Sequence, residues 1–92
     1  MTWDVAIVGA GYVGVPLAYT FATAGRRALL VDVSQEIVDA LNRGQSHIED
    51  IPDADLTPLV EQGLLTATTD YDRLRDADAI LIALPTPLSR QR

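Results

Sequence analysis

The chain has 92 residues, 48% of them apolar and 22% charged, a balance that predicts one small packed domain and excludes a disordered chain. Thirteen acidic residues against seven basic ones give a net charge of −6, which argues against nucleic acid as a partner because it repels a phosphate backbone. The absence of cysteine excludes disulfides, thiolate metal sites and a cysteine nucleophile from these residues.

Residues 3–8 and 28–33 are predicted strands. Both are short runs rich in Val, Ile and Leu that are apolar on both faces, as in strands buried in a parallel sheet. Residues 15–24 between them form a predicted helix, with Pro16 in its first turn and Gly25 at its end. This is a strand, helix, strand unit.

The same stretch, residues 5–25, is uncharged and as long as a membrane-spanning helix. Asp4 precedes it and no basic residue does, whereas a signal peptide opens with a basic region. Glycines and Pro16 also interrupt the apolar run. We therefore expect no membrane segment and a cytoplasmic protein.

The second half of the chain repeats the alternation of helices and strands. Ser34 is a candidate cap for the next helix, and glycines follow the predicted helices as stop signals. The expected elements are a helix over 34–43, a polar surface loop over 45–55, a helix over 56–62, a strand over 64–68, a helix over 71–77 and a strand over 79–84. Such alternation favours a parallel sheet with right-handed crossovers.

We therefore predict an α/β fold: a three-layer Rossmann-type parallel sheet with helices on both faces and strand order 3-2-1-4. Residues 1–92 would form the first half of one such domain.

A G-x-G-x-x-G motif, formed by Gly9, Gly11 and Gly14, lies between the first predicted strand and the first predicted helix. Asp32 ends the next strand 18 positions beyond Gly14, close to the spacing of about 20 that is typical of dinucleotide-binding folds. The glycine motif lies between a strand and a helix, and an acidic residue follows at the expected distance. Together these features indicate NAD much more specifically than the glycines alone.

Each motif residue has its own physical reason. Gly9 allows a sharp turn, Gly11 lets the backbone approach a pyrophosphate, and Gly14 lets the helix pack close to the strand. The amides of Tyr12, Val13 and Gly14 would hold the anion at the positive end of the helix dipole. Asp32 would accept hydrogen bonds from the adenosine ribose and repel a 2'-phosphate, which favours NAD over NADP. The alternative is a merely structural tight turn beside a solvated aspartate.

Other conspicuous side chains carry weaker signals. Arg26 and Arg27 could form a 2'-phosphate clamp, but they precede the second strand, and a solvated role at the helix end is favoured. Trp3, Tyr19 and Phe21 are expected in the core or at its rim. One histidine and four carboxylates in a loop resemble a metal site without a defined geometry, and we expect no metal there; these are His47, Glu49, Asp50, Asp53 and Asp55.

Three segments in register resemble the N-terminal domain of the UDP-glucose/GDP-mannose dehydrogenase family, the NAD-dependent nucleotide-sugar 6-dehydrogenases. They contain G-x-G-Y-V-G-x-P-L-A, then L-N-x-G after the second strand, then A-T-T-D followed by P-T-P, and they span nearly all 92 residues. The segment SHIED is most similar to members that act on UDP-N-acetylhexosamines.

The resemblance implies that a sugar C6 alcohol is oxidised to a carboxylate, with two NAD reduced and a thioester formed on a cysteine. It implies cofactor contacts at Tyr12, Val13, Asp32, Pro85 and Thr86, and a full-length enzyme that is a homo-oligomer in polysaccharide biosynthesis. Thr86 follows the carboxyl end of a central strand, where open α/β sheets bind ligands. The less favoured alternative is that its hydroxyl stabilises a turn between two prolines.

Two departures accompany the resemblance. Ile37 stands where many relatives carry a basic residue, and the family's catalytic cysteine, lysine and asparagine belong to sequence beyond residue 92, so no catalytic residue is predicted here. Two rival functions remain: a non-catalytic dinucleotide-sensing regulatory domain, and the first half of a hydroxyacid or hydroxyacyl dehydrogenase. Because the last strand has nothing to pair with its far edge, we also expect the isolated chain to be marginally stable or to self-associate.

Overall fold

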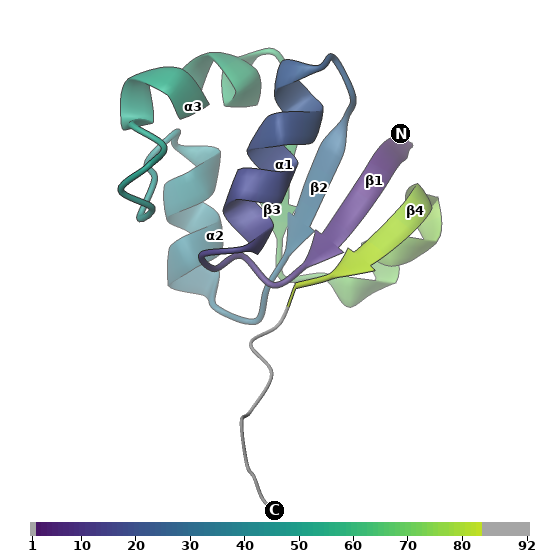
Figure 1. Ribbon diagram of the computed structural model, residues 1–92. Helices are drawn as coiled ribbons and strands as arrows, with labels where there is room; N and C mark the ends of the chain where they lie inside the picture. Colours follow the sequence, from purple (N-terminus) through teal and green to yellow (C-terminus); the bar gives the residue numbers. More distant parts are fainter. Residues whose placement is uncertain (1, 84–92) are drawn as a thin grey trace, which may run out of the picture.

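The computed structural model describes residues 2–83, which form a four-stranded parallel sheet in the order β3-β2-β1-β4 (Figure 1). The strands are β1 (Trp3–Val8), β2 (Ala28–Val31), β3 (Leu65–Thr68) and β4 (Ala77–Ile82). The predicted fold class and strand order are therefore confirmed. The order reverses between β1 and β4, because β1 leads to β2 on one side and β3 returns to β4 on the other.

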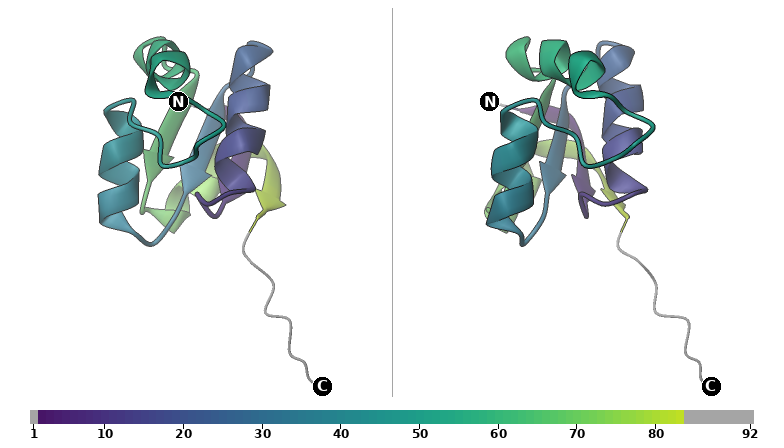
Figure 2. Two further views of the ribbon diagram at one scale, coloured as in Figure 1. Left: turned by 60° about the vertical axis from the view of Figure 1, so that its left-hand side comes forward. Right: turned by 90° about the vertical axis from the view of Figure 1, so that its left-hand side faces the viewer.

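Three α-helices cover one face of the sheet, and a short 3-10 helix lies on the other (Figures 1 and 2). The first three are α1 (Gly14–Thr23), α2 (Gln35–Asn42) and α3 (Asp53–Glu61), and the 3-10 helix is η1 (Tyr71–Asp76). Figure 2 shows α1 and α2 side by side along the strands, with α3 across their upper ends. The sheet is thus sandwiched between two unequal layers.

The main core lies on the face covered by the α-helices. Ile7 and Leu30 from the sheet, Val15 from α1, Leu41 from α2 and Leu56 from α3 are fully buried and belong to one cluster. The burial of each such side chain stabilises the folded state by roughly 1.5–3 kcal/mol. This cluster holds α1 against β1, and so fixes the helix end that follows the glycine motif.

A smaller cluster lies on the η1 face, where Trp3 is buried and Leu74 packs against it. The guanidinium of Arg27 lies 4.8 Å from the centre of the Trp3 ring, a cation–π geometry. The solvated role expected for both arginines is therefore wrong for Arg27, while Arg26 is exposed. Tyr19 and Phe21 are partly buried against the main core, as expected.

Several predicted boundaries are wrong by a few residues. β2 ends at Val31 rather than 33, because the side chain of Asp32 takes up local backbone amides. β4 begins at Ala77 instead of 79, and the helix expected over 71–77 is a 3-10 helix. α3 begins at Asp53 rather than 56, since Pro52 is extended and acidic side chains occupy the first turn, where the helix dipole favours them.

The segment 45–52 is more than the polar surface loop predicted from its composition. Ile48 and Ile51 are buried in the main core, and they anchor the segment. The Ser46 hydroxyl bonds backbone groups of Ile48, and Asp53 accepts a hydrogen bond from the Ser46 amide at 2.7 Å. Two isoleucines at a spacing of three residues were the signal for this anchoring.

Asn42 of the L-N-x-G motif satisfies the outer edge of β3. Its side-chain amide donates to the Ala67 carbonyl and its oxygen accepts from the Ala67 amide, both at 2.9 Å. The side chain thus pairs with an edge strand as a further strand would. Leu41 of the same motif is fully buried, so the motif organises the fold.

β4 differs from the buried strand that its apolar sequence predicts. Ile80, Leu81 and Ile82 are 49%, 37% and 75% exposed. β4 pairs with β1 on one side only, and no described residue pairs with its other edge. No helix within residues 2–83 is long and apolar enough to cross a membrane.

Candidate functional site

The glycine turn connects β1 to α1 at the carboxyl edge of the sheet (Figure 1). Gly9 has φ +107°, a conformation that side chains with a Cβ rarely adopt. Its amide donates to the Val31 carbonyl at 2.8 Å, so the turn remains tied to β2 as the chain leaves β1. Gly9 therefore has the turning role predicted for it.

Gly14 is the first residue of α1 and lies directly against the turn. A Cβ at this position would overlap the carbonyl oxygen of Gly9 and come within 3.4 Å of Ile7. The absence of a side chain is what allows the helix to begin so close to β1. The packing role predicted for Gly14 matches this geometry.

Gly11 contrasts with Gly14. A Cβ at Gly11 would meet no atom of the chain within 4 Å. Neither folding contacts nor a positive φ require glycine at this position. What remains is open space over the backbone, beside Tyr12 and Val13, which are 78% and 60% exposed.

The backbone amides of residues 11–14 are available to an external acceptor. None of them donates a hydrogen bond to another residue within 2–83, and the first bond of the helix runs from the Val15 amide to the Gly11 carbonyl. Val13 at the N-cap makes no side-chain cap, and the first turn of α1 contains no acidic residue. An uncapped helix start with free amides is a suitable site for an anion such as a pyrophosphate.

Asp32 follows β2 directly and lies next to the turn. One carboxylate oxygen accepts from the Ala10 amide at 2.8 Å, and the other accepts from the Ser34 amide at 2.9 Å. The link to Ala10, which the sequence motif did not reveal, fixes the turn relative to β2. Each carboxylate oxygen has a further lone pair, so both oxygens can still accept from a ribose hydroxyl.

Two exposed apolar side chains lie at the same edge of the sheet. Val33, after Asp32, is 80% exposed, and Ile82, at the end of β4, is 75% exposed. Both follow or end strands at the carboxyl edge, where the strand order reverses between β1 and β4. Open α/β sheets bind ligands in the crevice at this switch point. Val33 and Ile82 were not among the predicted site residues, since their exposure depends on the positions of neighbouring strands.

The other predicted site features fall elsewhere. Pro85 and Thr86 lie outside the described residues. Among residues 2–83, no three His, Asp or Glu side chains come together in a way that could hold a metal ion. A hollow in the described structure lies between α1, β1 and β4, and no residue of the glycine turn lines it.

These features define the chain as a dinucleotide-binding α/β domain. The order of the parallel strands reverses next to β1, a glycine turn offers free amides at the start of a helix, and an acidic residue follows the second strand. The residues present fit a dinucleotide, because donors, open space and a ribose acceptor converge at one edge. The chain belongs to the UDP-glucose/GDP-mannose dehydrogenase family, whose NAD binding domain matches residues 3–92.

Individual relatives are similar over most of this chain. It is 43% identical over 84 residues to the UDP-glucose 6-dehydrogenase AglM of Haloferax volcanii, covering 91% of this chain and 20% of the relative. It is 41% identical over 85 residues to the UDP-N-acetyl-D-mannosamine dehydrogenase of Escherichia coli K12, covering 90% and 19%.

A crystal structure of GDP-mannose dehydrogenase from Pseudomonas aeruginosa, solved as a ternary complex, has a similar fold. The TM-score is 0.86 at 34% identity, over 95% of this chain and 20% of that one. The chain therefore spans about a fifth of the length of the relatives that it matches.

Proposed function

We propose that residues 1–92 are the NAD-binding part of a longer nucleotide-sugar 6-dehydrogenase that oxidises the C6 alcohol of a UDP-sugar to the carboxylate. Membership of the family and its NAD binding domain support the cofactor and the reaction class. The substrate and catalytic groups would come from the rest of the enzyme. The two rival functions, a regulatory dinucleotide sensor and a hydroxyacid or hydroxyacyl dehydrogenase, are not favoured by these relatives.

The finer parts of the proposal rest on the relatives and the sequence. A UDP-N-acetylhexosamine is the proposed substrate, because several relatives are named UDP-N-acetyl-D-mannosamine dehydrogenases and the segment SHIED favours that subgroup. We further propose a cytoplasmic homo-oligomer in polysaccharide biosynthesis, with Pro85 and Thr86 beside the cofactor.

One observation carries the proposed cofactor site: the amides of residues 11–14 donate to no residue within 2–83, and Gly11 leaves open space next to the start of α1. This arrangement offers donors and a positive helix end to a pyrophosphate. Tyr12 and Val13 would flank the cofactor, while Gly9 and Gly14 shape the turn.

Asp32 supports NAD over NADP. Its carboxylate lies next to the turn, where the adenosine ribose of a bound dinucleotide would reach it. A 2'-phosphate would bring a second negative charge to the same place. The carboxylate would therefore favour ribose hydroxyls and disfavour NADP.

Calorimetric titration with NAD and NADP tests the site in the longer enzyme and in the 92-residue chain. We expect NAD binding to weaken in Gly11→Val, because the added side chain enters the open space, where its Cβ meets no other atom of the chain within 4 Å. Unchanged NAD affinity in a folded Gly11→Val protein would contradict the proposed pyrophosphate site.

Asp32 needs two substitutions because it also bonds the Ala10 and Ser34 amides. Asp32→Ala removes both roles, whereas Asp32→Asn removes the charge and retains one acceptor oxygen. We expect both variants to weaken NAD binding, and Asp32→Asn to narrow the preference for NAD over NADP. If Asp32→Asn kept the same preference for NAD over NADP, the negative charge of Asp32 would be excluded as the source of that preference.

The reaction is tested by following NADH formation from UDP-glucose and UDP-N-acetylmannosamine. The longer enzyme is expected to release two NADH for each sugar oxidised. NAD binding without NADH formation from either sugar would favour the regulatory alternative.

A further inference from the structure

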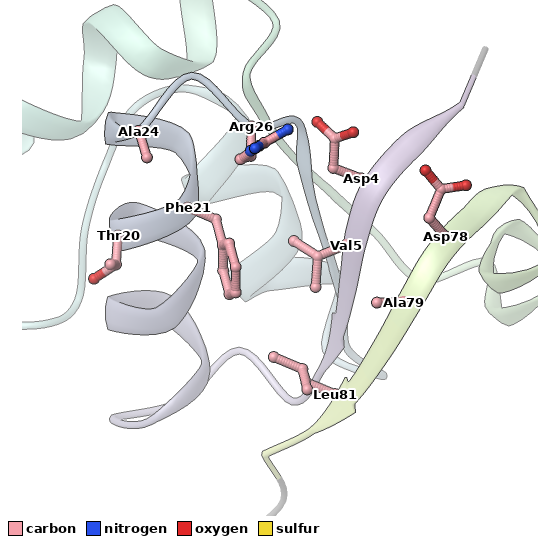
Figure 3. A pocket seen from close by; sticks show the side chains of 9 residues that line it. All are labelled: Asp4, Val5, Thr20, Phe21, Ala24, Arg26, Asp78, Ala79 and Leu81. Carbon is pink, nitrogen blue, oxygen red and sulfur yellow. The ribbon is translucent and has the colours of Figure 1, made fainter.

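A hollow of about 570 Å³ lies between the second half of α1 and the strands β1 and β4 (Figure 3). Figure 3 shows Phe21 of α1 opposite Val5 of β1 and Leu81 of β4, with Ala79 between the strands. Two carboxylates, Asp4 and Asp78, and the guanidinium of Arg26 line the end where the strands begin. The hollow is thus apolar along its length and charged at one end.

This hollow does not belong to the dinucleotide site. The glycine turn follows β1 at its carboxyl end, whereas Asp4 and Asp78 lie near the amino ends of their strands. Ligands of open α/β sheets bind outside the carboxyl ends. Apolar walls beside an unpaired edge strand suit a packed polypeptide segment better than a soluble ligand.

The handedness of the fold restricts which segment can fill the hollow. Right-handed crossovers place α1, α2 and α3 on one face, because the chain moves from β1 toward β3. The return from β3 to β4 runs in the opposite direction, so η1 lies on the other face. A next parallel strand beside β4 would continue in that direction, and its crossover would also lie on the η1 face.

That crossover would cover Ile80 and Ile82, which lie on the η1 side in register with Ala6 and Val8. It would leave Ala79 and Leu81, on the α1 side, uncovered. The occupant of the hollow must therefore come from sequence beyond the next crossover, or from another molecule. The relatives that this chain matches are about five times as long, so a family member has ample chain for this role.

The charged end indicates the chemistry of the occupant. Asp4 and Asp78 lie at adjacent positions of β1 and β4, between the paired residues Trp3 and Ala77 and the paired residues Val5 and Ala79. Like charges on neighbouring strands repel. Asp4 accepts one hydrogen bond here, from the Arg27 amide at 2.8 Å. Arg26 is the single basic residue lining the hollow, and it forms no ion pair within residues 2–83. A cation placed between the two carboxylates would relieve their repulsion.

We propose that the hollow receives a segment from the later part of the same dehydrogenase, which inserts apolar side chains between Phe21 and Leu81 and places a basic residue at Asp4 and Asp78. The inference rests on the proposed function in one respect, namely that residues 1–92 belong to a longer enzyme. It assigns this face of the domain to contact with the rest of the protein, and the carboxyl edge to the cofactor.

Cysteine labelling tests the proposal, and α1 offers a matched pair of positions. Thr20 and Thr23 are both exposed, and each hydroxyl bonds the carbonyl four residues earlier, but only Thr20 lines the hollow. Thr20→Cys and Thr23→Cys would be made in the 92-residue chain and in the longer enzyme. Reaction with a maleimide would be followed by peptide mass spectrometry, which separates these sites from any native cysteine.

In the 92-residue chain, both variants are expected to react at similar rates. In the longer enzyme, the Thr20→Cys site is expected to react at least about tenfold more slowly, because buried sites react only through local opening, while the Thr23→Cys site keeps its rate. Equal reactivity at both positions in the folded enzyme would overturn the proposal. If the Thr20→Cys site in the 92-residue chain became protected from the maleimide as the protein concentration rises, the occupant would be a second copy of this chain, and the proposal would be overturned.

The charged end has its own test in the longer enzyme carrying Thr20→Cys. Asp78→Arg is expected to raise the labelling rate, because it would repel the basic residue, whereas Asp72→Arg on η1, away from the hollow, should leave the rate unchanged. An unchanged rate in Asp78→Arg would overturn the basic contact. NADH formation is measured on the same preparations, so protection without activity would contradict the proposed function and leave the packing inference standing.

Discussion

The two sides of the sheet differ in how completely the chain satisfies them. At the β3 edge, Asn42 bonds both backbone groups of Ala67, and Leu65 is fully buried. At the β4 edge no described residue pairs with the strand, and Ile80 and Ile82 are 49% and 75% exposed. Within the described residues, side chains of the chain itself therefore satisfy the sheet at its β3 edge, whereas its β4 edge keeps free backbone groups and exposed apolar side chains.

The glycine turn repeats this contrast on a smaller scale. Gly14 is closed, because its missing side chain is needed for contact with Gly9, whereas Gly11 is open to solvent. Closed positions serve the fold and open positions are available for binding. Substitutions at closed positions should therefore change stability, and substitutions at open positions should change binding. The following predictions are ordered by their expected effect on the free energy of unfolding.

The largest loss is expected for Gly14→Ala. The added Cβ would overlap the Gly9 carbonyl oxygen, so helix and strand would have to separate. We expect a loss of about 3 kcal/mol or more in the free energy of unfolding, measured by urea denaturation. Gly11→Ala is the matched control, with an expected change within about 0.5 kcal/mol. Equal losses in the two variants would abolish the distinction between closed and open glycines.

Asn42→Ala should have the next largest effect. It removes both side-chain bonds to Ala67 and leaves a partly buried amide and carbonyl unpaired. The expected loss is about 1–3 kcal/mol, again from urea denaturation. Gln35→Ala, on the exposed surface of the same helix, controls for helix effects and should stay within about 0.5 kcal/mol. A loss no greater than that of Gln35→Ala would show that the β3 edge is not held by Asn42.

Arg27→Ala tests the small cluster on the η1 face. It removes the cation–π contact with Trp3, at an expected cost of about 0.5–1 kcal/mol. Its neighbour Arg26 is exposed and has no such contact, so Arg26→Ala should be close to neutral. Thermal and urea unfolding with tryptophan fluorescence would compare the two variants. Identical stabilities would mean that the stacking contributes nothing measurable.

Ile80→Lys should change the stability of the monomer least, by less than about 0.5 kcal/mol, because the side chain is half exposed. Its effect should be on association, since a charge on an exposed edge strand discourages edge-to-edge pairing. Sedimentation of the isolated chain is expected to show self-association that Ile80→Lys reduces. Val33→Lys, at another exposed apolar position, should have no such effect. A monomeric, cooperatively unfolding wild-type chain would contradict the expected association.

Much of the fold could be predicted from the sequence because its signals are local. Apolar runs, Ser34 as a cap and glycines after helices indicated the alternation of elements, and the cap is observed, with the Ser34 hydroxyl accepting from the Ile37 amide at 3.3 Å. Errors arose where distant contacts decide the outcome. Ile48 and Ile51 lie in a polar segment, and only the surfaces of the surrounding core show that they are buried.

The candidate site also has features that local sequence predicts and features that only distant contacts create. The spacing of the glycines and Asp32 identified the turn and its acid, because each residue type answers a local requirement of the backbone. The Asp32 to Ala10 bond, the exposure of Val33 and Ile82 and the hollow beside α1 could not be predicted, since they join residues far apart in the chain.

The order and type of most elements, the glycine turn and the family follow from the amino-acid sequence alone, since periodicity, capping and motif spacing are properties of neighbouring residues. Three features follow from the packing of distant elements: which glycine is closed and which is open, which edge of the sheet is satisfied, and where apolar surface stays exposed. These depend on the distances between elements that packing brings together, and a linear pattern does not contain those distances.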